Sequence, residues 1–201
     1  MIILFTRTES FQQFIRLYPV VCILLALNIL LFLLTFLPFF PEYLLLERWS
    51  GYNRFIAAGE WWRLVTSIFL HRSFSHLLFN CFSIIILAPA LEKMLGRIRF
   101  CFFFLIAGII ANIATYLLTP PAFSHVGASN AILGVLGFYV YLAAFHKQMM
   151  SRQHAMTIYA LTAVSVFMTF MQPETNHIGH LSGLAAGVVL APLFRKKLSL
   201  F

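Results

Sequence analysis

Long apolar stretches separated by short polar segments make up most of this chain of 201 residues. The first lies at about residues 19–40, and five more lie at about 74–95, 98–118, 128–145, 155–171 and 178–194. A helix needs about 20 mostly apolar residues to cross the hydrocarbon core of a bilayer. The pattern therefore predicts an all-α membrane protein, a bundle of six transmembrane helices that forms one domain over residues 1–201.

The connection between the first two predicted spans, residues 41–73, has a different character. It holds many of the charged residues and all three tryptophans, Trp49, Trp61 and Trp62. Tryptophan favours the membrane–water interface, and a structureless loop of this length would be unusual. We therefore expect short amphipathic helices that lie on, or partly in, the outer leaflet.

Composition agrees with a membrane protein, since 61% of the residues are hydrophobic and only 10% are charged. The formal net charge of +8 would suit nucleic acid. The basic residues are scattered between apolar runs, however, so we interpret them as topology signals, expect the lipid bilayer as the partner and expect no nucleic acid. The three cysteines lie within apolar runs without metal-ligand spacing, and the six acidic residues are all Glu. A mechanism that needs paired intramembrane Asp residues is excluded.

The distribution of basic residues predicts the orientation. Six spans place both termini on one side, and ten of the 14 Lys and Arg residues fall on that side: Arg7, Arg16, Lys93, Arg97, Arg99, Lys147, Arg152, Arg195, Lys196 and Lys197. Cytoplasmic loops carry the excess of Lys and Arg. Both termini are therefore predicted to be cytoplasmic, and the second, fourth and sixth spans begin at the outer face.

Polar side chains gather where these three spans begin. The second span opens with His76 and Asn80, the fourth with Ser129, and the sixth with His177 and His180. Polar groups in lipid surroundings are costly unless they find partners, so an intramembrane polar residue suggests a functional site. Three separate segments thus place reactive groups at one depth near the outer surface.

Their chemistry suggests a serine nucleophile with a histidine base. Ser129 needs a base such as imidazole to attack at neutral pH, and the two groups must approach to about 3 Å. Small residues on the fourth and sixth spans allow the two backbones to pack closely; they are Gly127, Ala131, Gly134, Gly137, Gly179, Gly183, Ala186 and Gly187. Because the chain has no Asp, a Ser–His dyad is the available arrangement.

An oxyanion intermediate would also need hydrogen-bond donors. The amide of Ser129 is expected at a helix start, where N–H groups lack intrahelical partners. His76 and Asn80 stand at positions i and i+4, so they share one face of the second span, and both can donate.

Taken together, these residues resemble the rhomboid family of intramembrane serine proteases. The resemblance extends from about Trp61 to Gly187 and rests on several segments. They are Glu60-Trp61-Trp62-Arg63, His71 to Asn80 (HRSFSHLLFN), Glu92 to Gly96, Gly127-Ala128-Ser129, and His180 to Gly187 with the spacing His-x2-Gly-x3-Gly.

The resemblance implies six helices around a water-filled cavity open to the outer face. It implies that Ser129 is the nucleophile, that His180 rather than His177 is the base, and that His76 and Asn80 complete the oxyanion hole. The implied activity is cleavage of transmembrane protein substrates near the outer face, without a cofactor, and the implied location is a bacterial plasma membrane. Two positions depart from the family pattern: Asn130 stands where Gly is usual, and Leu133 where many members have Tyr.

Three alternatives remain open. One is a catalytically silent rhomboid-like protein that binds transmembrane helices. Another is a small transporter or channel, which would spread ionisable groups along a path instead of clustering them at one end. The third is a metal site made of His71, His76, His177 and His180, which lacks a His-Glu-x-x-His helix and a nearby Cys ligand. The fifth span, with Phe167, Met168, Phe170 and Met171, and the 172–177 loop are a candidate gate and cap.

Overall fold

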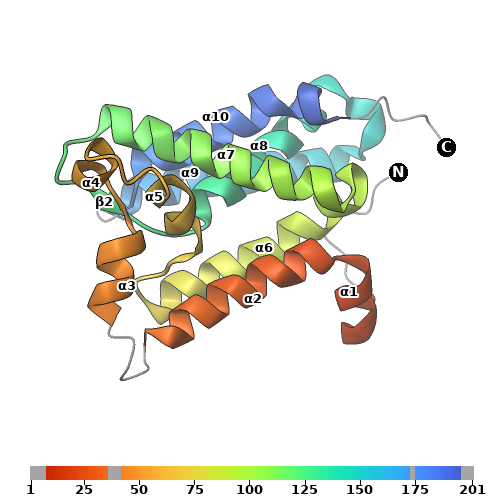
Figure 1. Ribbon diagram of the computed structural model, residues 1–201. Helices are drawn as coiled ribbons and strands as arrows, with labels where there is room; N and C mark the ends of the chain where they lie inside the picture. The colour runs from red at the N-terminus through yellow and green to blue at the C-terminus, as the bar shows by residue number, and fades with distance from the viewer. Residues whose placement is uncertain (1–7, 36–41, 173–174, 196–201) are drawn as a thin grey trace.

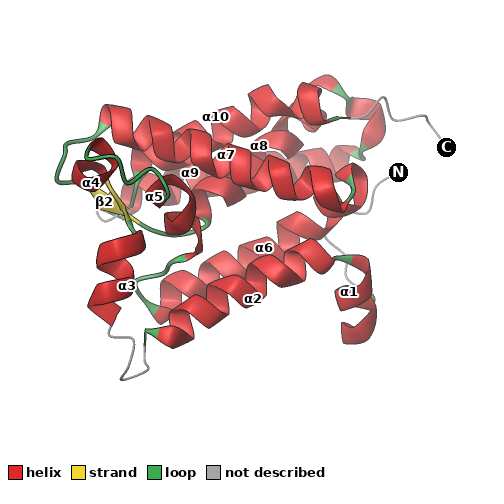
Figure 2. Cartoon of the chain, in the orientation of Figure 1, coloured by secondary structure: helices red, strands yellow, loops and turns green. Residues whose placement is uncertain are grey.

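The computed structural model describes residues 8–35, 42–172 and 175–195, and they are almost entirely helical (Figure 2). Each predicted apolar run corresponds to a long helix: α2 (Pro19–Leu34), α6 (Phe74–Leu95), α7 (Arg97–Leu118), α8 (Ser129–Phe145), α9 (Arg152–Met171) and α10 (His177–Phe194). The predicted all-α bundle is confirmed. Helix α2 ends earlier than the predicted first span, and residues 36–40 of that span lie outside the described residues.

By length and composition, four helices within the described ranges can each cross a membrane: α6, α7, α9 and α10. Helix α2 meets the same criterion only together with α1 (Phe11–Leu17), from which it is bent by 105°. Helix α8 is apolar but has 17 residues. The number of six spans therefore stays a prediction.

The bend between α1 and α2 has a clear physical cause. Pro19 is the first residue of α2, where a missing N–H and a fixed φ suit a helix start. The next two N–H groups, of Val20 and Val21, donate to the carboxylate of Glu92 on α6 at 3.1 and 2.9 Å. A carboxylate thus caps the positive end of α2 and fixes it against α6, beside which it lies in Figure 1.

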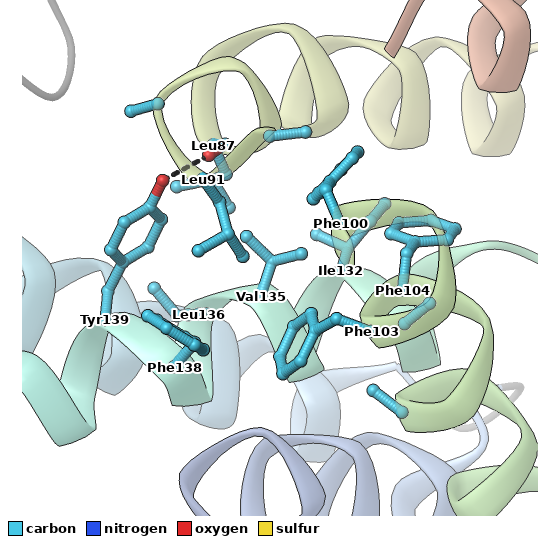
Figure 3. Close-up of a cluster of buried hydrophobic side chains, with 14 of the residues drawn as sticks. Leu87, Leu91, Phe100, Phe103, Phe104, Ile132, Val135, Leu136, Phe138 and Tyr139 are labelled. Carbon is cyan, nitrogen blue, oxygen red and sulfur yellow. Dashed lines mark hydrogen bonds between the residues drawn. The ribbon is translucent and has the colours of Figure 1, made fainter. Parts of the chain in front are cut away.

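Helix α8 is the centre of the bundle. Every side chain from Asn130 to Tyr139 is buried, and α8 packs most extensively against α10 and α7. Figure 3 shows Phe103 of α7 and Val135 and Phe138 of α8 in this core. The hydroxyl of Tyr139 donates to the carbonyl of Leu87 on α6 at 2.7 Å, which ties α6 to the same core.

Four glycines form the contact between α8 and α10, which we call the glycine seam: Gly134, Gly137, Gly183 and Gly187. A Cβ atom on Gly183 would overlap the carbonyl oxygen of Asn130, and one on Gly187 would overlap that of Gly134. Such a seam lets two helices approach backbone to backbone. The close approach expected from the small residues is therefore present.

Large apolar side chains cover the outside of the bundle. Phe79 on α6 is 70% exposed, and Leu118, Phe167 and Val189 on α7, α9 and α10 are each at least 60% exposed. A protein in water rarely exposes large apolar patches. These faces suit contact with lipid.

Short helices occupy the connection between α2 and α6: α3 (Glu42–Trp49), α4 (Asn53–Ala57), α5 (Arg63–Thr66) and the 3-10 turn η1 (Ser67–Phe69). A second 3-10 turn, η2 (Lys147–Met149), joins α8 to α9. Strand β1 (Gly51–Tyr52) pairs antiparallel with β2 (Ser124–His125), a pairing that the sequence did not predict.

Arg63 holds the connection together from the inside. It is 2% exposed, forms an ion pair with Glu60 at 2.6 Å, and donates to the carbonyls of Glu47 and Ser50 at 2.6 and 3.0 Å. The planar guanidinium satisfies several acceptors at once. It thereby joins α5 to α3 and to the residue before β1, at one end of the bundle (Figure 1).

Candidate active site

Ser129 and His180 lie in direct contact. His180 Nε2 and Ser129 Oγ are 2.8 Å apart, a hydrogen-bond distance, although the residues are far apart in the sequence. Ser129 is the first residue of α8, and His180 lies in the first turn of α10. The Asn176 side chain caps α10 by accepting from the Gly179 N–H at 2.9 Å. Both side chains are half-buried and stand at the same end of the glycine seam.

The turn before Ser129 depends on Gly127. Its φ of +120° is a value that residues with a side chain rarely adopt. Its N–H donates to the carbonyl of Ser67 at 2.9 Å, which anchors the turn to η1. A Cβ on Gly127 would lie 2.6 Å from His76 Nε2, so the imidazole of His76 packs directly on this glycine. The structure therefore brings His76 beside Ser129.

Asn80 lies one turn further along α6, and its amide points back to its own helix. Its Nδ2 donates to the carbonyl of His76 at 2.9 Å, and its side chain is 4% exposed. The Oδ1 atom has no partner among the described residues. Asn80 is thus near the proposed site without a hydrogen bond to Ser129 or His180.

His177 and His180 have different surroundings. His177 is the first residue of α10, and its ring lies 5.4 Å from the ring of Phe170 on α9. The hydrogen bond to Ser129 comes from His180. Across the described ranges, no three His, Cys, Asp or Glu side chains gather closely enough to hold a metal ion.

Two further histidines are buried in the connecting segments. Burial and then the neighbouring His76 lower the pKa of His71 to about 3. Burial and then Arg72 lower the pKa of His125 to about 4. Both rings are therefore neutral at pH 7. The ring of His71 lies 5.0 Å from that of His76, and the ring of His125 packs on Gly51 of β1.

Asn130, which follows Ser129 and departs from the family pattern, has a specific partner. Its Nδ2 donates to Asn112 Oδ1 on α7 at 2.7 Å. Asn112 in turn donates to the Leu64 carbonyl at 2.8 Å and to Ser67 Oγ at 3.1 Å. A Cβ on Gly179 would lie 2.6 Å from the Asn130 amide, so that glycine makes room for it. The buried pair links α8 and α7 to α5 and to η1, which anchors Gly127, and the sequence did not indicate it.

Thr169 of α9 is a second contact that sequence reasoning missed. Its side chain is 2% exposed, and its Oγ1 lies 2.9 Å from His180 Nδ1 and 2.8 Å from the Ser165 carbonyl. Thr residues in apolar helices commonly bond to their own backbone. The sequence therefore carried no signal that would single out Thr169.

Comparison with known proteins identifies the family. The family model called Rhomboid domain matches residues 58–197. The chain belongs to the rhomboid family. The rhomboid protein YdcA of Bacillus subtilis (strain 168) is 46% identical over 194 residues, which cover 96% of this chain and 98% of YdcA. The resemblance inferred from the motifs is confirmed.

More distant members are named as proteases. Rhomboid protease GluP of Bacillus subtilis (strain 168) is 36% identical over 139 residues, 69% of this chain and 27% of GluP. Rhomboid-like protease 1 of Toxoplasma gondii is 29% identical over 174 residues, 82% of this chain and 58% of that protein. Rhomboids are a family of intramembrane serine proteases, and this rhomboid, with its apolar helices, is an integral membrane protein.

Proposed function

We propose that this rhomboid is an intramembrane serine endopeptidase in which Ser129 is the nucleophile and His180 is the base. The observation that carries the proposal is the 2.8 Å contact between His180 Nε2 and Ser129 Oγ. A nucleophile and a base within hydrogen-bond reach are the signature of covalent acyl transfer.

The reaction follows from this contact. His180 Nε2 takes the proton of Ser129 Oγ as the oxygen attacks the peptide carbonyl carbon of the substrate. The C–N bond then breaks, and the leaving amine takes the proton from His180 Nε2. Water, deprotonated by the same Nε2, attacks the ester carbonyl; the bond between the acyl carbon and Ser129 Oγ breaks, and Oγ takes the proton back from Nε2. No step needs a metal ion or an organic cofactor.

The oxyanion would be held at the start of α8. The Ser129 N–H belongs to the first turn of that helix, where donors lack intrahelical partners and the dipole favours negative charge. His76 stands beside Gly127 and would be a second donor. Asn80 uses one N–H for the His76 carbonyl, and the second N–H of the same amide would serve the oxyanion.

The substrates would be transmembrane proteins that are cut near the outer face. The excess of Lys and Arg on the side of the termini supports cytoplasmic ends and an outward-facing site. Of those residues, Arg7, Lys196 and Lys197 lie outside the described part of the chain. The relatives in Bacillus subtilis support a bacterial plasma membrane.

Helix α9 is the proposed gate. Only 11% of its most apolar window is buried, against 33–50% for α6, α7 and α10. The least packed helix costs the least to displace, and a substrate helix would enter beside it. The 172–177 loop is the proposed cap, although residues 173 and 174 lie outside the described ranges.

The test is covalent labelling of the purified protein in detergent by a fluorophosphonate, which reacts with activated serines. We expect wild type and the control Ser182→Ala to be labelled, and Ser129→Ala and His180→Ala to stay unlabelled. Ser182 is a matched control because it also lies on α10, two residues after His180. Equal labelling of Ser129→Ala and wild type would overturn the proposal. A folded wild type that neither reacts nor cleaves would favour a silent, helix-binding rhomboid.

A further inference from the structure

One polar side chain of helix α9, that of Thr169, points into the protein and contacts His180, the proposed base. Among the described residues of α9, only Ile158 and Thr169 are buried. Thr169 Oγ1 lies 2.9 Å from Nδ1 of His180, the ring nitrogen opposite the one that contacts Ser129. The imidazole is therefore held on both sides, by α8 and by α9.

The direction of this hydrogen bond follows from counting protons. The Thr169 hydroxyl has one proton, and the Ser165 carbonyl 2.8 Å away can only accept, so both contacts of Thr169 are hydrogen bonds only when it donates to Ser165. Thr169 Oγ1 can then only accept from His180, so the proton of the neutral imidazole sits on Nδ1. Nε2 is left with its lone pair, and it faces the Ser129 hydroxyl at 2.8 Å. This is the tautomer that a general base needs.

We propose that Thr169 is the positioning residue of the base: it selects the Nδ1–H tautomer of His180 and keeps Nε2 aimed at Ser129. The proposal rests on the Ser129–His180 dyad proposed above. In a catalytic triad a carboxylate has this task, and this chain has no Asp. A neutral hydroxyl accepts the same hydrogen bond without placing a charge in the bilayer, where a charge is costly.

The surroundings of His180 leave this task to α9. Leu133, one turn after Ser129 on α8, has an apolar side chain that cannot accept from Nδ1. Within the described residues, Thr169 is the polar contact recorded for Nδ1. Because Thr169 stands on the least packed of the long helices, the orientation of the base depends on where α9 lies.

Three variants separate positioning from packing. Thr169→Val has nearly the same shape but lacks the hydroxyl, and Thr169→Ser restores the hydroxyl. Thr162→Val is the matched control, because Thr162 lies on the same helix and donates to the Ile158 carbonyl at 2.8 Å without touching His180. The kcat and KM for cleavage of a transmembrane reporter in liposomes, the melting temperature, and the 15N spectrum of His180 are measured for each.

We expect Thr169→Val to lower kcat by about 10- to 100-fold, the loss of a hydrogen bond to a group that becomes charged in the transition state. KM and the melting temperature should change little. Thr169→Ser and Thr162→Val should stay within about threefold of wild type, a difference of under 1 kcal/mol. The nitrogen spectrum should show the Nδ1–H form in wild type and a growing Nε2–H form in Thr169→Val.

Several results would overturn the role of Thr169. One is an unchanged kcat with an unchanged tautomer in Thr169→Val. Another is a loss of kcat in Thr162→Val equal to that in Thr169→Val. The third is a loss of kcat in Thr169→Val that Thr169→Ser shows as well. Failure of the dyad itself looks different, because the wild-type protein would then not cleave at all. The nitrogen spectrum reads the tautomer without any turnover, so it decides the role of Thr169 in that case too.

Discussion

Replacing Gly183 by Ala tests whether the glycine seam sets the distance between Ser129 and His180, the proposed nucleophile and base. The added Cβ would overlap the carbonyl oxygen of Asn130 and would lie 3.1 Å from its carbonyl carbon. Non-bonded carbon atoms pack at about 3.5–4.0 Å, so α10 must move away from α8 by roughly 1 Å to relieve both contacts. Both groups belong to helix backbone, which cannot rotate aside as a flexible side chain can.

The displacement would change the distance between Ser129 and His180, the proposed catalytic pair. Asn130 follows Ser129 in α8, and Gly183 is three residues after His180 in α10. A shift of this size takes the 2.8 Å contact out of hydrogen-bond range. A misplacement of about 1 Å can cost roughly 100-fold in rate, and overpacking a close contact costs about 1–3 kcal/mol of stability. We expect both losses, and they are of similar size, because 100-fold in rate corresponds to about 2.7 kcal/mol.

The assay is kcat/KM for a transmembrane reporter in liposomes, beside a melting curve of each purified variant. Ala185→Ser is the matched control, because it adds one atom to an exposed position of the same helix. A folded Gly183→Ala protein with wild-type turnover would refute the reasoning. It would mean that the two helices do not need this approach to align Ser129 with His180.

Other variants test the remaining parts of the site. Ser129→Ala and His180→Ala should each abolish cleavage, and the double variant should be no worse, since the two act as a unit; residual cleavage by Ser129→Ala would be the contrary result. His177→Ala should keep most of its activity, and EDTA should leave wild-type cleavage intact; equal loss from His177→Ala and His180→Ala would point to a metal. Asn80→Ala should lower kcat by up to about 10²–10³-fold with little change in KM. A lower melting temperature with normal kcat would show that Asn80 is not an oxyanion donor. Arg63→Ala should destabilise the protein by roughly 1–3 kcal/mol, because the buried Ser50 carbonyl loses its donor, and an unchanged melting curve would argue against that.

Helix positions could be predicted from the sequence because the bilayer imposes one strong constraint. A spanning segment must be apolar over a fixed length, and the run at 98–118 accordingly became α7, Arg97–Leu118. Glycine spacing likewise predicted the close approach of α8 and α10, since four glycines in register have few other uses in an apolar helix. The approach of Ser129 to His180 follows from these two facts together.

Contacts that depend on the rotation of one helix against another could not be predicted. Thr157, Thr162 and Thr169 all donate to the carbonyl four residues earlier, and only the packing of α9 distinguishes the one that meets His180. The pairing of Asn112 with Asn130 joins two helices that look apolar on their own. The same limit applies to β1 and β2, whose two-residue strands carry no periodic pattern.

The shortness of α8 has a consequence for hydrophobic matching to the bilayer. At about 1.5 Å per residue, its 17 residues span roughly 25 Å, whereas the hydrocarbon layer is about 30 Å thick. A helix facing lipid would have to thin the membrane around it, but α8 is shielded from lipid by its neighbours, so it can be short without that penalty. If the C-terminal end of α8 lies at one boundary of the hydrocarbon layer, Ser129 would lie about 5 Å below the opposite boundary. Membrane thickness should then affect the proposed reaction: thinner lipids should bring Ser129 closer to water, and thicker lipids should bury it more deeply.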